Sequence, residues 1–181
     1  MTVTPTRVRF LGAALACITA LSVPSAPPAH TQAAVVIVAL GASNTEGWGL
    51  PPSVSYPARL QVLLRAKGID ATVHNFGIAG DTTAGMLARL QNGMQAGTRL
   101  VILQPGTNDE RMGLAADRAR NIEAMRGWLT ARNIKLILIE NAVLDALPRS
   151  ELRPDGVHFT PAGYAILAER LLPEVLAALG M

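Results

Sequence analysis

The sequence contains one cysteine, few aromatic residues and no large excess of either charge. The only cysteine, Cys17, lies in an N-terminal segment that we expect to be removed, so the remaining chain would have no thiol for catalysis, zinc binding or a disulfide. Aromatic residues make up 4% of the 181 residues, which argues against a stacking platform for a sugar polymer. The net charge of +3 falls to +1 without Arg7 and Arg9, so a nucleic-acid partner gains no support.

The apolar run near the N-terminus is too short to span a membrane. Residues 10–23 form 14 consecutive mostly apolar residues, against about 20 for a spanning helix. Arg7 and Arg9 precede this run, and a segment rich in proline and alanine follows it. The pattern predicts that residues 1–33 are a signal peptide, cleaved between Ala29 and Ala34, and that the protein is periplasmic or secreted without a stable membrane anchor. An uncleaved anchor, or lipidation at Cys17, is the alternative.

Residues 34–181 are predicted to form a single α/β domain. Apolar strand-like runs alternate with helix-like segments, without repeats or a linker, which favours a mainly parallel sheet. The helix after the second strand is expected to begin at Thr83, with Asp81 or Thr82 as its cap. The predicted strands are 34–40, 71–75, 99–104 and 135–139, and the other predicted helices are 56–67, 115–132 and 161–179. Arginines 118, 120, 126 and 132 are expected on the solvated side of their helix.

Motifs for cofactors and metals are missing, whereas residues able to supply a nucleophile or amide donors follow three of the predicted strands. The chain has no glycine-rich phosphate loop, no His-Glu-x-x-His and no Gly-x-Ser-x-Gly, so neither a cofactor nor a metal is called for. Ser43 follows the first strand, Gly80 the second and Asn108 the third. The carboxyl ends of parallel strands meet at one edge of a sheet, so we expect these residues to lie close together.

Elimination leaves few candidates for a nucleophile and a base. After residue 33 there are two histidines and four serines, namely Ser43, Ser53, Ser55 and Ser150. His74 lies within an apolar strand and is expected to be structural. His158 lies before the last helix, three residues after Asp155, and a carboxylate beside an imidazole can fix its tautomer. Taken singly, Ser43 could instead be a turn residue or a helix cap. The Asp155–His158 pair could likewise be part of a structural turn.

Gly80 and Asn108 make the hypothesis of acyl transfer more specific. Acyl transfer builds negative charge on a carbonyl oxygen, which preorganised amide donors stabilise. The backbone of Gly80 could approach that oxygen closely, and Asn108 could donate from its side-chain amide. Asn108 also fits a simple Asx turn, in which its side chain serves the loop alone. Asp109 is expected to hold the loop that presents Asn108.

The candidate residues lie in four short segments, Gly41-Ala-Ser43-Asn44, Gly80-Asp81, Gly106-Thr-Asn108-Asp109 and Asp155-Gly-Val-His158. These four segments resemble the SGNH (GDSL-type) hydrolase superfamily, particularly its small secreted esterase and thioesterase group, over residues 34–179. The blocks occur in the family's order. The resemblance implies a flavodoxin-like three-layer α/β/α sandwich. It also implies that Ser43 is the nucleophile, His158 the base and Asp155 its orienting acid, and that the Ser43 and Gly80 N–H groups and Asn108 form the oxyanion hole. Two positions depart from the family pattern, because Ala42 replaces an aspartate and Asn44 replaces a leucine.

The sequence therefore predicts a serine-dependent hydrolase of small carboxylic esters or thioesters, acting through an acyl-enzyme on Ser43. Trp48, flanked by two glycines, is a candidate wall of the substrate site; alternatively it packs only under its own loop. A carbohydrate or cell-wall O-acetyl esterase is an alternative activity. A periplasmic binding protein without turnover is an alternative of another class, because a fold does not prove a function. Acyl chain length, leaving group and oligomeric state stay open.

Overall fold

The computed structural model describes residues 1–2 and 34–181. The predicted signal peptide, residues 1–33, therefore lies outside the described residues except for its first two positions. Among the described helices, none combines the length and the apolar character needed to cross a bilayer.

Four parallel strands form the sheet at the centre of residues 34–181. They are β1 (Val35–Gly41), β2 (Ala71–Gly77), β3 (Thr98–Gln104) and β4 (Lys135–Leu138), in the order β2-β1-β3-β4. Gly41 pairs with Gly77 on one side and with Gln104 on the other. These three strands consequently end at the same level, and the segments that follow them share one edge of the sheet.

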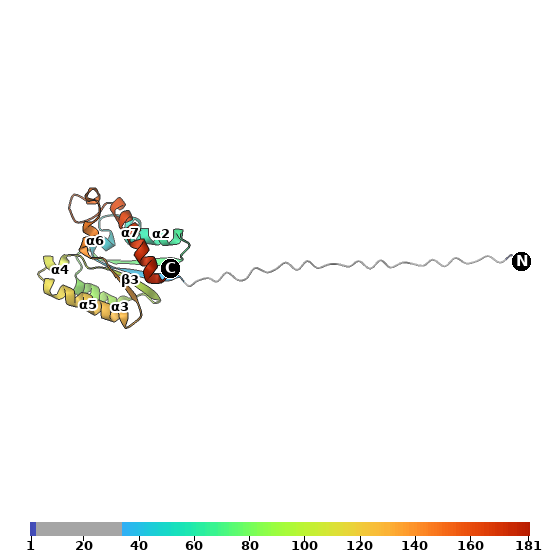
Figure 1. Ribbon diagram of the computed structural model, residues 1–181, viewed down its shortest axis with the longest axis horizontal. Helices are drawn as coiled ribbons and strands as arrows, with labels where there is room; N and C mark the ends of the chain where they lie inside the picture. The colour runs from blue at the N-terminus through green and yellow to red at the C-terminus, as the bar shows by residue number, and fades with distance from the viewer. Residues whose placement is uncertain (3–33) are drawn as a thin grey trace. The chain divides into compact units, whose positions relative to one another are not determined.

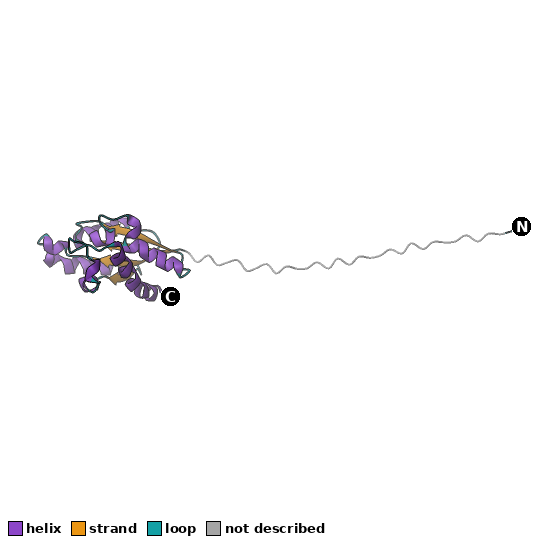
Figure 2. Ribbon diagram, turned by 90° about the horizontal axis from the view of Figure 1, so that it is seen from above, coloured by secondary structure: helices purple, strands orange, loops and turns teal. Residues whose placement is uncertain are grey.

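Helices cover both faces of the sheet, as Figure 1 and Figure 2 show. On one face lie α2 (Tyr56–Ala66) and α7 (Pro161–Leu179), and on the other lie α3 (Thr83–Gly93) and α5 (Ala115–Thr130). Side chains of β1 alternate between the two cores, so that Ile37 packs with α2 and α7 while Val38 packs with α3 and α5. This arrangement confirms the predicted three-layer α/β/α sandwich with a parallel sheet.

The chain direction places a crevice at the carboxyl ends of β1 and β3. The connection from β1 to β2 runs through α2 on one face, whereas the connection from β2 to β3 runs through α3 on the other. Because the strand order reverses between β1 and β3, their carboxyl ends form the switch point at which open α/β sheets bind ligands. Short helices follow these strands: α1 (Ser43–Glu46) after β1 and α4 (Asn108–Arg111) after β3.

The main predicted elements are present, and where an end differs from the prediction it shifts by one or two residues. The sequence patterns did not predict the short elements at the carboxyl edge. These are α1, α4, the 3₁₀ turn η1 (Pro52–Val54), α6 (Asn141–Asp145) and the 3₁₀ turn η2 (Arg149–Glu151). Elements of three to five residues are too short to show a helical repeat, so hydrophobic periodicity cannot find them.

Candidate active site

Ser43 is the first residue of α1 and lies at the carboxyl end of β1. Its backbone N–H has no hydrogen-bond partner among the described residues. Gly41 allows the tight approach of α1 to β3, because a Cβ on Gly41 would lie 2.1 Å from Thr45 Oγ1 and 2.8 Å from Gln104 O. The Thr45 hydroxyl donates to Gln104 Oε1 at 3.2 Å, which ties α1 to the end of β3. The Ser43 turn is therefore held rigidly at the switch point.

Asn44, one of the two departures from the family pattern, connects the Ser43 turn to the loop that carries His158. Its Nδ2 donates to Val157 O at 3.1 Å, and its Oδ1 accepts from the Tyr164 hydroxyl at 2.9 Å. Asn44 is 8% exposed and Tyr164 is fully buried. Burial raises the pKa of Tyr164 to about 12, so its hydroxyl stays protonated and donates across the neutral range. A leucine could make neither of these hydrogen bonds.

The loop before α7 brings Asp155 and His158 into direct contact. His158 Nδ1 lies 3.0 Å from Asp155 Oδ2, while Asp155 Oδ1 accepts from the backbone N–H groups of Val157 and His158, both at 2.9 Å. The backbone N–H of His158, followed by that of Val157 and by the imidazole, holds the pKa of Asp155 well below its ordinary value of 3.8. Asp155 is therefore ionised, and its Oδ2 accepts a hydrogen bond from the protonated Nδ1 of His158.

This contact determines what the other ring nitrogen can do. When Nδ1 of a neutral imidazole carries the proton, Nε2 is an acceptor. Nε2 of His158 is buried and has no hydrogen-bond partner within residues 34–181. Ser43 and His158 do not hydrogen-bond to each other in this structure. The site thus contains an oriented, unengaged base, whose partnership with Ser43 stays a prediction.

Gly80 and Asn108 lie on the loops that follow β2 and β3. Gly80 has φ of +79°, a left-handed conformation that favours glycine, and its N–H has no partner among the described residues. Asn108 is the first residue of α4, and its Nδ2 donates to Asp81 O at 2.8 Å. An amide nitrogen carries two hydrogens, so this bond fixes the side chain and leaves one hydrogen for a ligand. Ser43, Gly80 and Asn108 therefore offer three N–H donors at one edge of the sheet.

Asp109 and Thr82 support these loops. Asp109 is 1% exposed, and its carboxylate accepts from the Thr83 backbone N–H at 3.0 Å and from the Thr83 hydroxyl at 2.6 Å. It thus ties the Asn108 loop to α3, as expected. Of the two predicted caps of α3, Thr82 is the one present, because its Oγ1 accepts from Gly85 N; Asp81 instead pairs with Arg89.

One arginine predicted to face solvent faces this region instead. The Arg118 side chain is only 19% exposed, and its Nε donates to Gly106 O at 3.4 Å in the turn between β3 and α4. The expectation for Arg118 was therefore wrong. The reason is that the guanidinium also lies 3.5 Å from Glu110 Oε1 on α4 and 4.0 Å from Glu140 Oε2, so these contacts draw the side chain toward the site.

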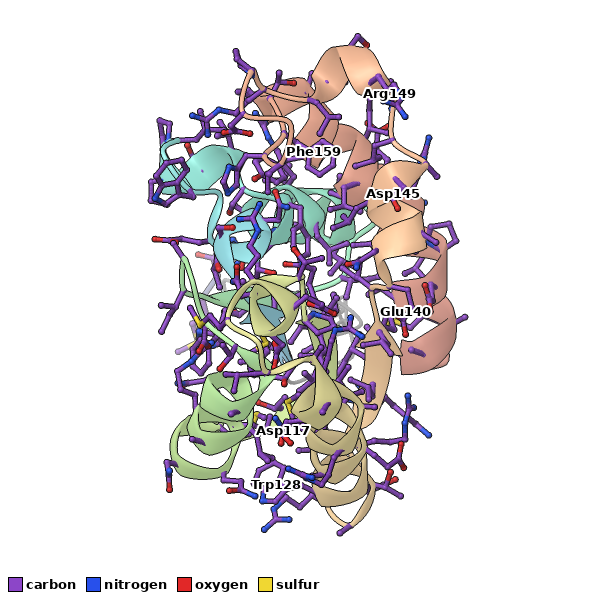
Figure 3. The ribbon with its side chains drawn as sticks, turned by 90° about the vertical axis from the view of Figure 1, so that its left-hand side faces the viewer. Asp117, Trp128, Glu140, Asp145, Arg149 and Phe159 are labelled. Atoms are coloured by element: carbon purple, nitrogen blue, oxygen red, sulfur yellow. The ribbon has the colours of Figure 1, made fainter. Side chains whose placement is uncertain are left out.

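A cavity of about 680 Å³ opens beside Ser43 and Asn108. Its apolar wall comes from the segment between β4 and α7, and charged residues of α4, α6 and η2 also line it. Three of the lining residues, Asp145, Arg149 and Phe159, are labelled in Figure 3. The apolar side chains of that wall are Leu144, Leu147, Leu152, Val157 and Phe159, and the charged ones are Arg111, Asp145 and Arg149. The sequence did not predict this wall, because nothing in it placed residues 140–152 against Ser43.

Trp48 does not line this cavity. Its ring packs against the imidazole of His158 with centroids 4.9 Å apart, and it is 46% exposed. Arg153 Nη1 donates to Trp48 O at 2.7 Å, which joins the Trp48 loop to the His158 loop. Trp48 therefore lies beside the imidazole of His158, and the cavity beside Ser43 lies elsewhere.

Comparison with known proteins places the chain among ester hydrolases by sequence similarity. Residues 39–148 match the model of the GDSL-like Lipase/Acylhydrolase family. The esterase TesA of Pseudomonas aeruginosa is 35% identical over 109 residues, which are 59% of this chain and 54% of that protein. An arylesterase of Vibrio mimicus is 38% identical over 86 residues, 47% of this chain and 43% of that protein. The chain therefore spans about half the length of these curated relatives.

Solved structures agree with the family match. A crystal structure of TesA superposes with a TM-score of 0.72 at 26% identity, covering 79% of this chain and 99% of that one. AlinE4, an SGNH-hydrolase family esterase, superposes with a TM-score of 0.54 at 29% identity, covering 80% of this chain and 79% of that one. The resemblance drawn from the four sequence segments is confirmed: the chain belongs to the GDSL-like lipase/acylhydrolase family of SGNH hydrolases.

Proposed function

We propose that this protein is a carboxylic ester hydrolase with Ser43 as nucleophile. The observation that carries the proposal is the His158–Asp155 contact at 3.0 Å, which leaves a buried and unpartnered Nε2 on the loop that Asn44 ties to the Ser43 turn. An oriented base beside a serine is the arrangement that activates a hydroxyl for acyl transfer. The names of the relatives, an esterase and an arylesterase, support the same reaction class.

The reaction proceeds in two halves. Nε2 of His158 takes the proton of Ser43 Oγ as the oxygen attacks the carbonyl carbon, and the same nitrogen then protonates the leaving alcohol or thiol. Water attacks the carbonyl carbon of the acyl-enzyme and gives its proton to Nε2; the bond from that carbon to Ser43 Oγ then breaks, Nε2 returns the proton to Oγ, and the acid is released. Asp155 stays ionised and stabilises the imidazolium in both halves, because two backbone N–H groups hold its charge.

Three N–H donors would bind the oxyanion in both halves. They are the backbone N–H groups of Ser43 and Gly80 and the second amide hydrogen of Asn108. Such donors cost no reorganisation when charge develops, and removing one typically lowers turnover by ~10²–10³-fold. The unpartnered state of the two backbone donors supports their assignment to this role.

The substrate is an ester or thioester whose acyl or alcohol part is apolar. The cavity beside Ser43 has an apolar wall formed by Leu144, Leu147, Leu152 and Phe159, which suits a hydrocarbon group. Polar and charged side chains, among them Asn141, Asp145 and Arg149, line the rest of the cavity, so a sugar ester is the alternative substrate. We further propose that residues 1–33 are a signal peptide and that the enzyme acts outside the cytoplasm. N-terminal sequencing of protein recovered from the periplasm or medium of an expressing bacterium would contradict this if Met1 or Thr2 were still present.

Hydrolysis of nitrophenyl acyl esters of increasing chain length tests the activity. Wild type is expected to hydrolyse them, and Ser43→Ala and His158→Ala to lose this activity while remaining folded. Ser53→Ala is a matched control, because Ser53 is exposed on η1 and should be dispensable. Absence of turnover by folded wild type across esters and thioesters would refute the proposal and leave a binding role.

A further inference from the structure

One side chain on α3 contacts the ends of two strands and the loop that carries Gly80. Arg89 Nε and Nη2 donate to Asp81 Oδ2 at 3.1 and 2.6 Å. Nη1 donates to Phe76 O, near the end of β2, at 2.9 Å, and Nη2 also lies 3.4 Å from Gly41 O, at the end of β1. The side chains of Arg89 and Asp81 are 26% and 13% exposed, so the pair is partly shielded from water.

The Gly80 loop is held from two sides. On the side of α1, Glu46 Oε2 accepts from Ala79 N at 2.7 Å, and on the side of α3, Arg89 binds Asp81. Within the loop, Asp81 N donates to Ile78 O at 3.1 Å, closing a turn around Gly80. The Gly80 N–H lies between these two anchors and is itself unpartnered among the described residues.

Asp81 also connects Arg89 to Asn108. The backbone oxygen of Asp81 accepts from Asn108 Nδ2 at 2.8 Å, and this bond fixes the amide orientation that leaves the second hydrogen for a ligand. A shift of Asp81 would therefore move the Gly80 N–H and turn the Asn108 amide together. Gly41 O, two residues before Ser43, lies against the same guanidinium.

We propose that Arg89 is a positioning residue for the oxyanion hole, acting through Asp81. The inference rests on the proposed function. The planar guanidinium carries several donors in fixed directions, so it can bind a carboxylate and backbone carbonyls at once, whereas the point charge of a lysine cannot reproduce that geometry. Preorganised donors lower the barrier because they are already in place, and a misplacement of about 1 Å can cost ~10²-fold in rate.

The experiment compares Arg89→Met, Arg89→Lys and Asp81→Asn with wild type. Arg65→Met is the matched control, since Arg65 Nε also donates to a backbone carbonyl, Ala71 O at 3.0 Å, but at the amino end of β2. We expect Arg89→Met to lower kcat by at least ~10-fold with KM changed by less than about twofold, because the donors act on the transition state. Arg89→Lys should recover little of the loss, and Arg65→Met should retain wild-type kcat.

A second measurement separates positioning from a general loss of structure. An alkyl boronic acid forms a tetrahedral adduct with the serine and places an oxygen in the oxyanion hole, so its affinity should fall in Arg89→Met by a factor similar to kcat. If Arg89→Met does not fold, Asp81→Asn, which keeps the size of the side chain, must show the same two losses.

Normal kcat and normal boronic acid affinity in a folded Arg89→Met variant would overturn the inference, as would a rise in KM alone. In either case wild type remains active, so the proposed function stands. Failure of wild type to hydrolyse any ester would instead refute the proposed function and this inference with it.

Discussion

Replacing Asn44 by leucine tests whether this residue joins the two halves of the active site. The change keeps the branched arrangement of the side-chain heavy atoms, with methyl groups in place of the amide, and removes both hydrogen bonds, those with Val157 O and with the Tyr164 hydroxyl. Tyr164 is fully buried, so water cannot readily replace the partner of its hydroxyl, whereas Val157 O is partly exposed and the loss of its partner costs less. Each buried polar group left unpaired costs about 1–3 kcal/mol.

The expected loss for Asn44→Leu is therefore about 2–4 kcal/mol in the free energy of unfolding. For a domain of this size that corresponds to a fall in Tm of about 5–15 °C. Val157 precedes His158, so release of its carbonyl should also let the imidazole move away from Ser43. We expect kcat for a short nitrophenyl ester to fall at least ~10-fold, because catalysis is sensitive to such displacements.

A double-mutant cycle with Tyr164→Phe isolates the buried bond. Tyr164→Phe removes the hydroxyl that Asn44→Leu leaves unpaired, so the double variant should recover about 1–2 kcal/mol relative to the sum of the single losses. Asn92→Ala is the control, because Asn92 is exposed and its side chain donates only within α3, to Ala88 O. It should change stability by less than about 0.5 kcal/mol.

Chemical denaturation followed by far-UV circular dichroism measures these free energies. The reasoning is refuted if Asn44→Leu is within about 0.5 kcal/mol of wild type, the range of ordinary surface substitutions. It is also refuted if the effects of Asn44→Leu and Tyr164→Phe simply add, because the two side chains would then not be coupled.

Three further predictions concern the carboxylate of Asp155, the oxyanion hole and the cavity. The folded pKa of Asp155 lies below 3.8, so its carboxylate stabilises the fold above that pH and loses this effect as the pH falls through the lower folded value. The stability difference between wild type and Asp155→Asn, followed by thermal melts, should thus be largest near neutrality and shrink in acid; a constant difference would contradict this. Asn108→Ala should lower kcat by ~10²–10³-fold in ester hydrolysis, and a loss confined to KM would argue against an oxyanion role. Leu144→Phe should shift the preferred acyl chain to a shorter one in the nitrophenyl series, and an unchanged profile would place the acyl group outside this cavity.

The sequence predicted the layers of the fold because the main elements repeat regularly. Side chains of β1 alternate between two cores, and α7 begins at Pro161 and ends at Leu179, where predicted, because a proline start and helical spacing mark it clearly. Residues at strand ends were also predictable, since parallel strands bring Ser43, Gly80 and Asn108 to one edge.

The rest depended on contacts between distant segments. The bond from Asn44 to Val157 spans 113 positions, and nothing in either segment indicates the other. Arg89 has the helical spacing of an ordinary surface residue, yet it binds two strand ends because α3 packs where β1 and β2 finish. The cavity wall from Leu144 to Phe159 arises from short turns that carry no hydrophobic period.

The most direct test of the central claim is mass spectrometry of the protein after treatment with a fluorophosphonate, which reacts with activated serines. We predict a single adduct on Ser43, lost in Ser43→Ala and formed at least ~10²-fold more slowly in His158→Ala, because the imidazole no longer accepts the proton. Folded wild type that stays unmodified, or an adduct on Ser53, Ser55 or Ser150, would contradict the assignment of Ser43 as the nucleophile.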